Sequence, residues 1–414
     1  MHSDSPSDDE YDSDEPAPLV LDLDILGRRA SHAVSRTFTH WRKLTKGRYH
    51  EVFVLYFTSD DTPRPTTDGQ HTDNQWTCIA RVSRQPEMLE KLQSEVETME
   101  YIRSHTTIPV PEIYAHDFRI NNNVGAQYIL MERMPGRHLY QLWDSLSLDY
   151  KKIAISEIAR VVSQLQQQRF DSIGCLSMTH IGPLIYRMGG PEGDERIYKG
   201  GPFNSTLDYL LHFLNAQTDG SEVFSEVEAV LRSHFEMYGS DIALLEPFRL
   251  THADFDAQNI LFTGGISNDP DIDDGGPPRL SGVIDWEHAY TGPLYFLYEY
   301  PIFIQDSDDN KEAYADNAIL RRVFKRALLQ YAPDGCMVWI ELQTAMKKNY
   351  TLNWFHRVFV RMAGGLGLPS LKMLAAEYVG NVRHGTGKAY EGRFDYVSDD
   401  EGSNEAVEVR TDDR

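Results

Sequence analysis

The sequence predicts an α+β protein in which a strand-rich N-terminal part precedes a mainly helical C-terminal part. Three short segments rich in β-branched and aromatic residues, 51–57, 76–82 and 127–131, predict strands in the first third of the chain. Apolar residues at helical spacing over 150–169 predict a core helix, and further helical patterns follow toward the C-terminus. A chain of 414 residues can hold two or three such core-forming parts.

The most informative stretch is a predicted hairpin built from two short apolar runs, 260–262 and 283–284, which a polar loop connects. In an antiparallel hairpin, the start of the first strand lies beside the end of the second. Asn259 directly precedes the first strand and Asp285 directly follows the second. The pairing therefore predicts that these two side chains lie together, with Asp254 close by in the same loop.

These three oxygen-bearing side chains suit a hard cation such as Mg²⁺. Two of them are enough to bind the metal, which leaves one carboxylate for another role. Asp254 could then orient or deprotonate a hydroxyl while Asn259 and Asp285 hold metal-bound phosphates, which is the division of labour in protein kinases. The kinase spacing H-x-D-x-x-x-x-N runs from His252 to Asn259, and Asp285 opens the sequence DWE.

The loop HADFDAQN, followed by IDWE, resembles the aminoglycoside phosphotransferase (choline-kinase-like) family, and especially its fungal-type members. The resemblance extends from Arg42 to Leu371. It implies a two-lobed protein-kinase-like fold with a small β-rich N-terminal lobe and a larger, mainly helical C-terminal lobe. It also implies ATP or GTP as phosphate donor, Mg²⁺ as cofactor and a hydroxyl of a small molecule as acceptor.

The resemblance assigns a role to each matching residue. Asp254 is expected to accept or steer the hydroxyl proton, and His252 to brace its loop. Asn259 and Asp285 are the expected magnesium ligands. The family's phosphate-binding cation lies on the second predicted strand and is usually Lys, whereas this chain has Arg81 there. A planar guanidinium differs in geometry from an ammonium group, so the resemblance leaves the geometry of the phosphate contact open.

A charged residue interrupts the apolar face of the helix that the pattern predicts over 85–104. Glu95 falls inside this apolar arc and is the only charge in it. Because a buried carboxylate is costly unless it is paired, its expected partner is Arg81, which would repeat the strand-cation and helix-acid pair of kinases. The alternative is that Glu95 lies at the edge of the arc and reaches water. The arc consists of Met88, Leu92, Val96, Met99 and Ile102.

Two backbone segments are candidates for nucleotide contacts. Gly47 precedes the first predicted strand, where its turn could lay backbone N–H groups over phosphate or serve only as a turn. The third strand ends in the pattern M-E-x-x-P-G, which resembles the family's interlobe hinge. There, adenine would take backbone hydrogen bonds from Met131, Glu132 and Arg133, although an ordinary strand exit would have the same sequence.

The net charge of −23 is concentrated at the two ends of the chain. The first 18 residues hold seven acidic and no basic side chains, and the last 16 hold seven acidic residues and two arginines. Both ends are predicted to be disordered, and the acidic remainder argues against a nucleic-acid partner. No apolar run is long enough for membrane insertion. Three scattered cysteines and the lack of a secretory signal favour a cytoplasmic location.

The segments between these landmarks complete the predicted organisation. Residues 180–203 are rich in Gly and Pro and are predicted to be loop. The predicted parts are an acidic disordered tail (1–27), an N-terminal nucleotide-binding lobe (28–131), a hinge (132–136), a C-terminal catalytic and substrate lobe (137–395) and a second acidic tail (396–414).

The chain departs from the family's usual catalytic loop at three positions. Ala253 replaces a Gly, Asp256 replaces a frequent His, and Gln258 stands where Gly is common. Asp256 adds negative charge near the expected acceptor site, where Glu287 and His288 are further candidates. Glu287 is also expected to brace the metal loop. These departures leave the identity of the acceptor open.

Two other functions fit parts of the pattern. A kinase-like scaffold that binds nucleotide without transferring phosphate would keep the same fold. A metal-dependent hydrolase could instead use His252, Asp254, Asp285 and His288 as ligands of a transition metal, which would leave Arg81 without a purpose.

Overall fold

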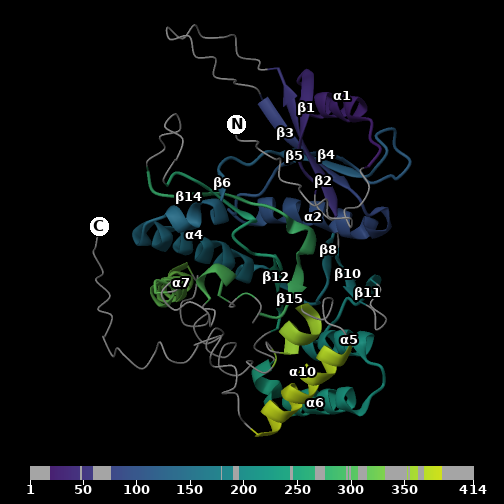
Figure 1. Cartoon of the computed structure of the whole chain (residues 1–414), viewed down its shortest axis with the longest axis vertical. Coiled ribbons are helices and arrows are strands. Elements are labelled where there is room, and N and C mark those ends of the chain that lie inside the picture. Colours follow the sequence, from purple (N-terminus) through teal and green to yellow (C-terminus); the bar gives the residue numbers. More distant parts are fainter. Residues whose placement is uncertain are drawn as a thin grey trace, which may run out of the picture. The chain divides into compact units, whose positions relative to one another are not determined.

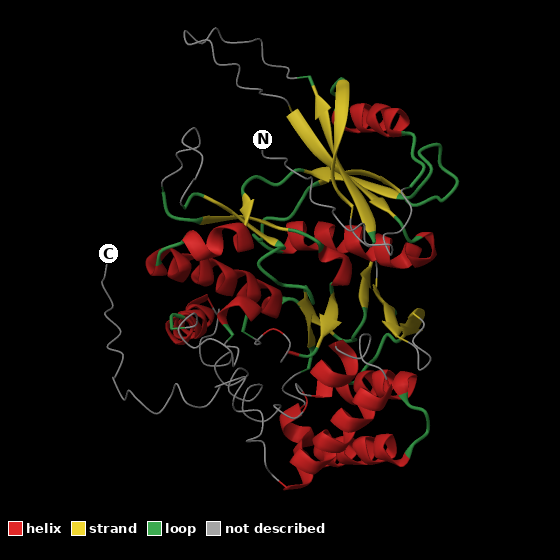
Figure 2. Ribbon diagram, viewed as in Figure 1, coloured by secondary structure: helices red, strands yellow, loops and turns green. Residues whose placement is uncertain are grey.

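The computed structural model describes residues 19–46, 49–58, 76–178, 180–189, 195–242, 246–265, 276–294, 297, 300–305, 315–331, 352, 355–361 and 368–384. They fall into two compact units, the first within Met1–Leu92 and Glu112–Arg133, and the second within Gln93–Pro111 and Met134–Arg414. The first is rich in strands and the second is larger and mainly helical (Figures 1 and 2). The prediction of an α+β, two-lobed protein-kinase-like fold is confirmed.

The first unit is built on a five-stranded antiparallel sheet with strand order β1-β2-β3-β5-β4 (Figure 1). Its three sequence-predicted strands are confirmed, with bounds shifted by one residue at most. The strands are β1 (Phe38–Lys46), β2 (His50–Phe57), β3 (Trp76–Ser83), β4 (Ile113–Asp117) and β5 (Tyr128–Glu132).

Helix α1 (Leu23–Val34) covers one face of this sheet and shares its apolar core. The Asp22 side chain caps the helix by accepting the Ile25 N–H at 2.8 Å. Leu26 is fully buried against the strands. The predicted disordered tail 1–27 is therefore wrong for residues 19–27, because five of their apolar side chains, Leu19, Leu21, Leu23, Ile25 and Leu26, pack in or against the core. Residues 1–18 and the second predicted tail lie outside the described residues.

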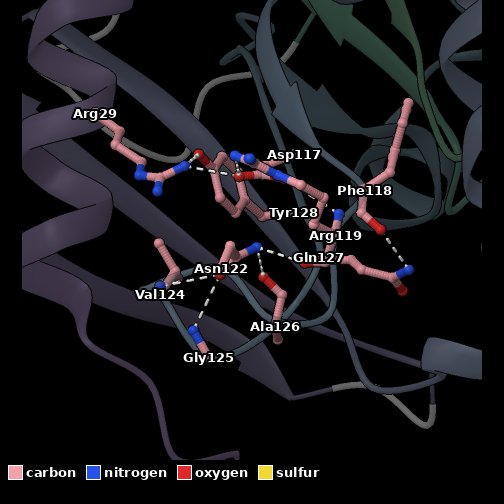
Figure 3. Close-up of polar contacts among 10 residues, drawn as sticks. All are labelled: Arg29, Asp117, Phe118, Arg119, Asn122, Val124, Gly125, Ala126, Gln127 and Tyr128. Carbon is pink, nitrogen blue, oxygen red and sulfur yellow. Dashed lines mark hydrogen bonds and ion pairs between the residues drawn. The ribbon is translucent and has the colours of Figure 1, made fainter.

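An ion cluster connects α1 to the turn between β4 and β5 (Figure 3). The buried Asp117 carboxylate accepts hydrogen bonds from Arg29 of α1 at 2.7 Å and from two guanidinium nitrogens of Arg119 at 2.8 and 2.9 Å. The hydrogen bonds from Arg119, together with that from Arg29, hold the pKa of Asp117 well below its ordinary value, although burial acts in the opposite direction. Arg29 also donates to the Tyr128 hydroxyl at 3.2 Å.

One buried side chain shapes the same turn. Asn122 donates from Nδ2 to the carbonyls of Arg119 and Ala126, both at 2.8 Å. Its Oδ1 accepts the N–H groups of Val124 at 2.9 Å and Gly125 at 3.1 Å (Figure 3). A single amide therefore satisfies two carbonyls and two N–H groups that the turn removes from the strand ladder.

Helix α2 (Leu89–His105) follows a short 3₁₀ turn, η1 (Pro86–Met88). The five residues of the predicted apolar arc are all buried. The prediction of an amphipathic helix over this segment is therefore confirmed. From Gln93 onward the helix belongs to the second unit, where the Tyr101 hydroxyl donates to Gln168 at 3.0 Å.

Helices make up most of the second unit (Figure 2). The predicted core helix is found as α4, which the Ser147 side chain caps by accepting the Tyr150 N–H. The helices are α3 (Leu139–Leu142), α4 (Leu148–Gln167), α5 (Thr206–Gln217), α6 (Glu222–Ile242), α7 (Asn317–Tyr331) and α10 (Leu368–His384), with 3₁₀ turns η2 (Trp143–Ser145), η4 (Trp286–His288) and η6 (Ile302–Ile304) and a π-helical turn η7 (Arg357–Arg361).

Small antiparallel sheets accompany these helices, with strand orders β15-β12-β7, β14-β13-β6, β10-β11 and β8-β9. The prediction of loop over 180–203 is wrong, because residues 184–189 pair antiparallel with residues 195–200, and Tyr186 stacks on Tyr198 across this pair. The strands are β6 (Arg137–His138), β7 (Arg169–Phe170), β8 (Cys175–Ser177), β9 (His180–Gly182), β10 (Leu184–Gly189), β11 (Glu195–Gly200), β12 (Phe248–Thr251), β13 (Ile260–Thr263), β14 (Arg279–Val283) and β15 (Tyr290–Gly292).

Within the described ranges, none of the helices has the length and apolar character needed to cross a membrane.

Candidate active site

The predicted hairpin is present in the second unit as β13 and β14, with Ile260 paired to Val283. Directly beyond this pair, the Ile284 N–H donates to the Asn259 carbonyl at 2.9 Å. Asn259 and Asp285 therefore lie at the same end of the hairpin, as the sequence predicts. Asp285 adopts a left-handed conformation with φ 64°, which ends the strand and begins η4.

Asn259 also connects the hairpin to the catalytic loop. Its Nδ2 donates to the Asp254 carboxylate oxygen Oδ2 and to the Asp254 carbonyl, both at 2.9 Å. The Asn259 N–H donates to the Asp256 carbonyl at 2.9 Å, which closes the loop on itself. Since Nδ2 is committed to Asp254, Oδ1 is the amide atom that is able to bind a cation.

The loop departs from ordinary backbone geometry at Ala253, whose φ is 61°. This left-handed conformation costs an alanine about 1–2 kcal/mol relative to the right-handed one. The family's usual Gly at this position adopts it without that cost. The position thus needs a special backbone conformation between His252 and Asp254, and this chain holds it with a residue that does not favour it.

His252 is 1% exposed and lies beneath the loop. Its ring packs against the Trp286 indole, with centroids 4.4 Å apart, and its Nε2 donates to the Ile284 carbonyl at 2.9 Å. Burial lowers the pKa of His252 below its ordinary value, although that hydrogen bond and the nearby carboxylates act in the opposite direction. The neutral ring, protonated on Nε2, therefore joins the loop to the end of β14, in agreement with a bracing role.

The residues after Asp285 form a support for this end of the hairpin. Trp286 is fully buried and its Nε1 donates to the Val283 carbonyl at 3.0 Å. The Glu287 carboxylate lies 3.3 Å from Nε2 of the half-exposed His288. Glu287 and His288 thus contact each other, and whether either contacts an acceptor stays a prediction.

A second support comes from a segment that the sequence reasoning missed. Nδ1 of His138, on β6, donates to the Gln258 carbonyl at 2.6 Å, and the Tyr140 N–H donates to the Ala257 carbonyl at 3.2 Å. Gly136 makes the approach of β6 to β13 possible, because a Cβ there would meet the Phe262 carbonyl oxygen at 2.5 Å. The only sequence signal for this support is the Pro-Gly pair before β6.

The first unit carries the expected phosphate-binding cation. Cys78, Ala80 and Val82 of β3 point into the core beneath α1, so Arg81 projects from the opposite face of the sheet. Arg81 is 7% exposed and donates to Nδ1 of His50 at 3.1 Å. The sequence reasoning did not identify His50 as a neighbour of this guanidinium.

The other predicted nucleotide contacts have different outcomes. Glu95 is 2% exposed, so its predicted burial is confirmed, whereas its pairing with Arg81 stays a prediction. Met131 and Glu132 end β5, and the chain passes from the first unit to the second after the exposed Arg133. Gly47 lies outside the described residues.

The end of the hairpin fits Mg²⁺ better than a transition metal. Asn259 offers an amide oxygen and Asp285 a carboxylate, and Mg²⁺ is commonly bound by one or two such ligands together with substrate phosphates. Among the residues that the structure describes, no three His, Cys, Asp or Glu side chains group as a metal site. His252 is moreover buried and bonded to a backbone carbonyl. The alternative of a four-ligand hydrolase site is therefore not supported.

Sequence comparison identifies a family and several fungal relatives. The profile of the phosphotransferase enzyme family (APH) matches residues 70–296. A subtelomeric hrmA-associated cluster protein of Aspergillus fumigatus strain Af293 is 26% identical over 276 residues, which cover 51% of this chain and 52% of the relative. Clavilactone A biosynthesis cluster protein Y of Ampulloclitocybe clavipes is 24% identical over 250 residues, 55% and 57% of the two chains. The chain thus spans about half the length of these curated relatives.

A mitochondrial protein and two solved structures are also similar. Altered inheritance of mitochondria protein 9 of Candida tropicalis is 30% identical over 170 residues, 41% of this chain and 24% of that protein. A putative aminoglycoside phosphotransferase of Ralstonia eutropha JMP134 aligns over 87% of this chain and 99% of its own, with 14% identity and a TM-score of 0.48. ADP-bound aminoglycoside phosphotransferase APH(2'')-Ib aligns over 90% and 100%, with 13% identity and a TM-score of 0.47.

Proposed function

Because the chain belongs to the phosphotransferase enzyme family, we propose that it transfers the γ-phosphoryl group of ATP or GTP to a hydroxyl group of a small molecule. One observation carries the proposal. Asn259 binds the Asp254 carboxylate through Nδ2 at 2.9 Å, while strand pairing places Asp285 at the same hairpin end. This grouping supports the assignment of one proton acceptor and two metal ligands, which phosphoryl transfer requires.

The chain's own residues divide the work as follows. Asp254 accepts or steers the proton of the acceptor hydroxyl, and the bond from Asn259 fixes the orientation of its carboxylate. Asn259 Oδ1 and the Asp285 carboxylate hold Mg²⁺, which when bound neutralises charge on the transferred phosphoryl group. Arg81 contacts the nucleotide phosphates from the face of the first unit's sheet that lies opposite α1.

The site is tested first by nucleotide binding. A thermal-shift measurement with ATP, GTP and no nucleotide, each with and without Mg²⁺, is expected to show stabilisation by at least one nucleotide that needs Mg²⁺. The variant Asp285→Ala is expected to lose this magnesium-dependent shift. No shift with either nucleotide would contradict the proposed site.

Transfer itself is tested at Asp254. Asp254→Ala is expected to lower the rate of acceptor-dependent nucleoside diphosphate release by about 10²–10⁴-fold, or roughly 3–5 kcal/mol of transition-state stabilisation. Asp149→Ala is the matched control, because that carboxylate is 86% exposed on the first turn of α4. If Asp254→Ala keeps the wild-type turnover, the proposed role of Asp254 is wrong. If the wild type binds nucleotide but transfers no phosphate, the chain is a nucleotide-binding scaffold.

The cytoplasm is the proposed location, on the grounds of the three widely spaced cysteines. The name of the Candida relative gives mitochondria as the alternative. Imaging of the fluorescently tagged full chain distinguishes the two.

A further inference from the structure

His50 and Arg81 lie close together on β2 and β3, which are neighbouring strands of the five-stranded sheet (Figure 1). Val52 of β2 pairs with Arg81 of β3. His50 precedes Val52 by two residues, and side chains two residues apart on one strand point to the same face. Phe53, the residue after Val52, belongs to the core that α1 covers. His50 and Arg81 therefore share the face of the sheet that lies opposite α1.

The hydrogen bond between these two side chains determines the protonation of the imidazole. A guanidinium group has only donors, so Nη2 of Arg81 donates and Nδ1 of His50 accepts, at 3.1 Å. His50 is therefore neutral in this arrangement and carries its hydrogen on Nε2. Because Arg81 is 7% exposed, protein groups rather than water set the direction of its guanidinium.

The residue that follows His50 holds the start of β2 in place. The Glu51 carboxylate is 2% exposed and accepts hydrogen bonds from Lys43 of β1 at 2.7 Å and from Arg84, which directly follows β3. It also accepts the Leu19 N–H at 3.1 Å. One buried carboxylate thus connects β2 to β1, to the end of β3 and to the segment before α1. The imidazole of His50 therefore projects from a backbone position that is fixed on the other face of the sheet.

An arginine depends on an orienting partner more than a lysine does. The donors of a planar guanidinium point in fixed directions, whereas an ammonium group is a compact charge with three rotatable donors. Since this chain has Arg81 where the family usually has Lys, its phosphate contact depends on the direction of the guanidinium plane. A neutral imidazole fixes that direction without offsetting the positive charge that attracts phosphate.

We propose that His50 is a positioning residue for the nucleotide, which orients the Arg81 guanidinium toward the phosphates by accepting one of its N–H groups. This inference rests on the proposed phosphotransferase function, in which Arg81 contacts the nucleotide phosphates. The effect of His50 on nucleotide binding should then pass through Arg81.

The experiment measures the Kd of ATP or GTP with Mg²⁺ by isothermal titration calorimetry, with whichever nucleotide gives the magnesium-dependent thermal shift. His50→Phe keeps a planar ring and removes the acceptor, so we expect the Kd to rise by ~10-fold or more. His50→Asn places an amide oxygen near the position of Nδ1, and its Kd should stay within about 3-fold of the wild type. His40→Phe is the matched control and should leave the Kd unchanged. His40 is an exposed histidine of β1 that pairs with Tyr56, away from the start of β2.

A double-mutant cycle with Arg81→Lys tests whether His50 acts through Arg81. In the Arg81→Lys background, His50→Phe should change the Kd by less than about 3-fold, because an ammonium group needs no partner to set its direction. An equal loss of affinity in both backgrounds would overturn the inference. If His50→Phe has no cooperative urea transition, His50→Ala takes its place in both backgrounds.

The nucleotide shift of the wild type separates this inference from the proposed function. If the shift is present but His50→Phe and His40→Phe bind nucleotide equally well, His50 does not position Arg81, and the phosphotransferase function stands. The same conclusion follows if His50→Asn loses as much affinity as His50→Phe. If the wild type shows no shift, the proposed function itself fails, and the inference fails with it.

Discussion

Asn122 lies between two asparagines, and this triplet allows the same substitution to be compared at three adjacent positions. Asn122 is 9% exposed, whereas Asn121 and Asn123 are both exposed. Replacing Asn122 by Ala removes four side-chain hydrogen bonds to the backbone, of 2.8 to 3.1 Å. Asn121→Ala and Asn123→Ala are controls for the change in composition.

The size of the effect follows from counting the backbone groups that lose a partner. Each hydrogen bond contributes about 0.5–1.5 kcal/mol net. The Gly125 N–H keeps a second contact, with the Asn122 carbonyl at 3.2 Å, so three of the four losses count fully. We therefore expect Asn122→Ala to lower the free energy of unfolding of the first unit by about 2–4 kcal/mol, and the two controls to change it by less than about 0.5 kcal/mol.

The assay is urea unfolding followed by tryptophan fluorescence, to which Trp76 contributes because it packs, partly buried, against the core of the same unit. At a typical dependence of about 1–3 kcal/mol per molar urea, the expected loss moves the midpoint by roughly 1–2 M. Equal midpoints for Asn122→Ala and Asn123→Ala would refute the reasoning, because the buried amide would then contribute nothing beyond an exposed one.

Asn122→Asp separates the two halves of this side chain. The carboxylate keeps the acceptor for Val124 and Gly125 but faces the carbonyls of Arg119 and Ala126 without a donor. We expect a loss at neutral pH at least as large as that of Asn122→Ala. Protonation restores one donor, so the folded-state pKa is raised above the unfolded value and stability should be regained as the pH falls. A loss that does not change with pH would contradict this.

Three other perturbations address the second unit by urea unfolding. Gly136→Ala should destabilise by more than about 2 kcal/mol, since φ is +100° and a Cβ would meet the Phe262 carbonyl; an unchanged midpoint would contradict this. Ala253→Gly should stabilise by about 0.5–1 kcal/mol, because relief of the left-handed strain exceeds the entropy cost of glycine, and a loss would reverse that balance. Burial lowers the pKa of His212 and His252, so these side chains bind protons at a higher pH in the unfolded chain than in the folded one. The free energy of unfolding should therefore fall as the pH drops from about 7 to 5. His212→Gln should flatten this dependence, and a slope equal to that of the wild type would contradict it.

The sequence predicted the core of the candidate site because the determining interaction is local. Asn259 and Asp285 flank two strands that pair directly, so the register of one hairpin fixes their proximity. The bond between Asn259 and Asp254 lies within a single loop. Such arrangements follow from strand pattern and motif spacing alone.

Other features could not be predicted, for identifiable physical reasons. His138 supports the loop across 120 residues of sequence, and no periodic pattern marks a single histidine with such a distant partner. Helix α1 follows an acidic stretch whose composition indicated disorder, although its apolar side chains are buried in the sheet core. In the hairpin of β10 and β11, the glycines and proline suggested loop, whereas the Tyr186 and Tyr198 pair indicates strands only once their register is known.

The hydrogen bonds of Asn259 determine how variants of this site should be interpreted. Because one side chain holds the carboxylate of Asp254 and also presents the proposed metal ligand, Asn259→Ala would remove both contributions together. The losses measured for Asn259→Ala and Asp254→Ala should then sum to more than the loss in the double variant, because the two residues act as one coupled unit. A double-mutant cycle, rather than any single substitution, is therefore the measurement that assigns energy to either residue.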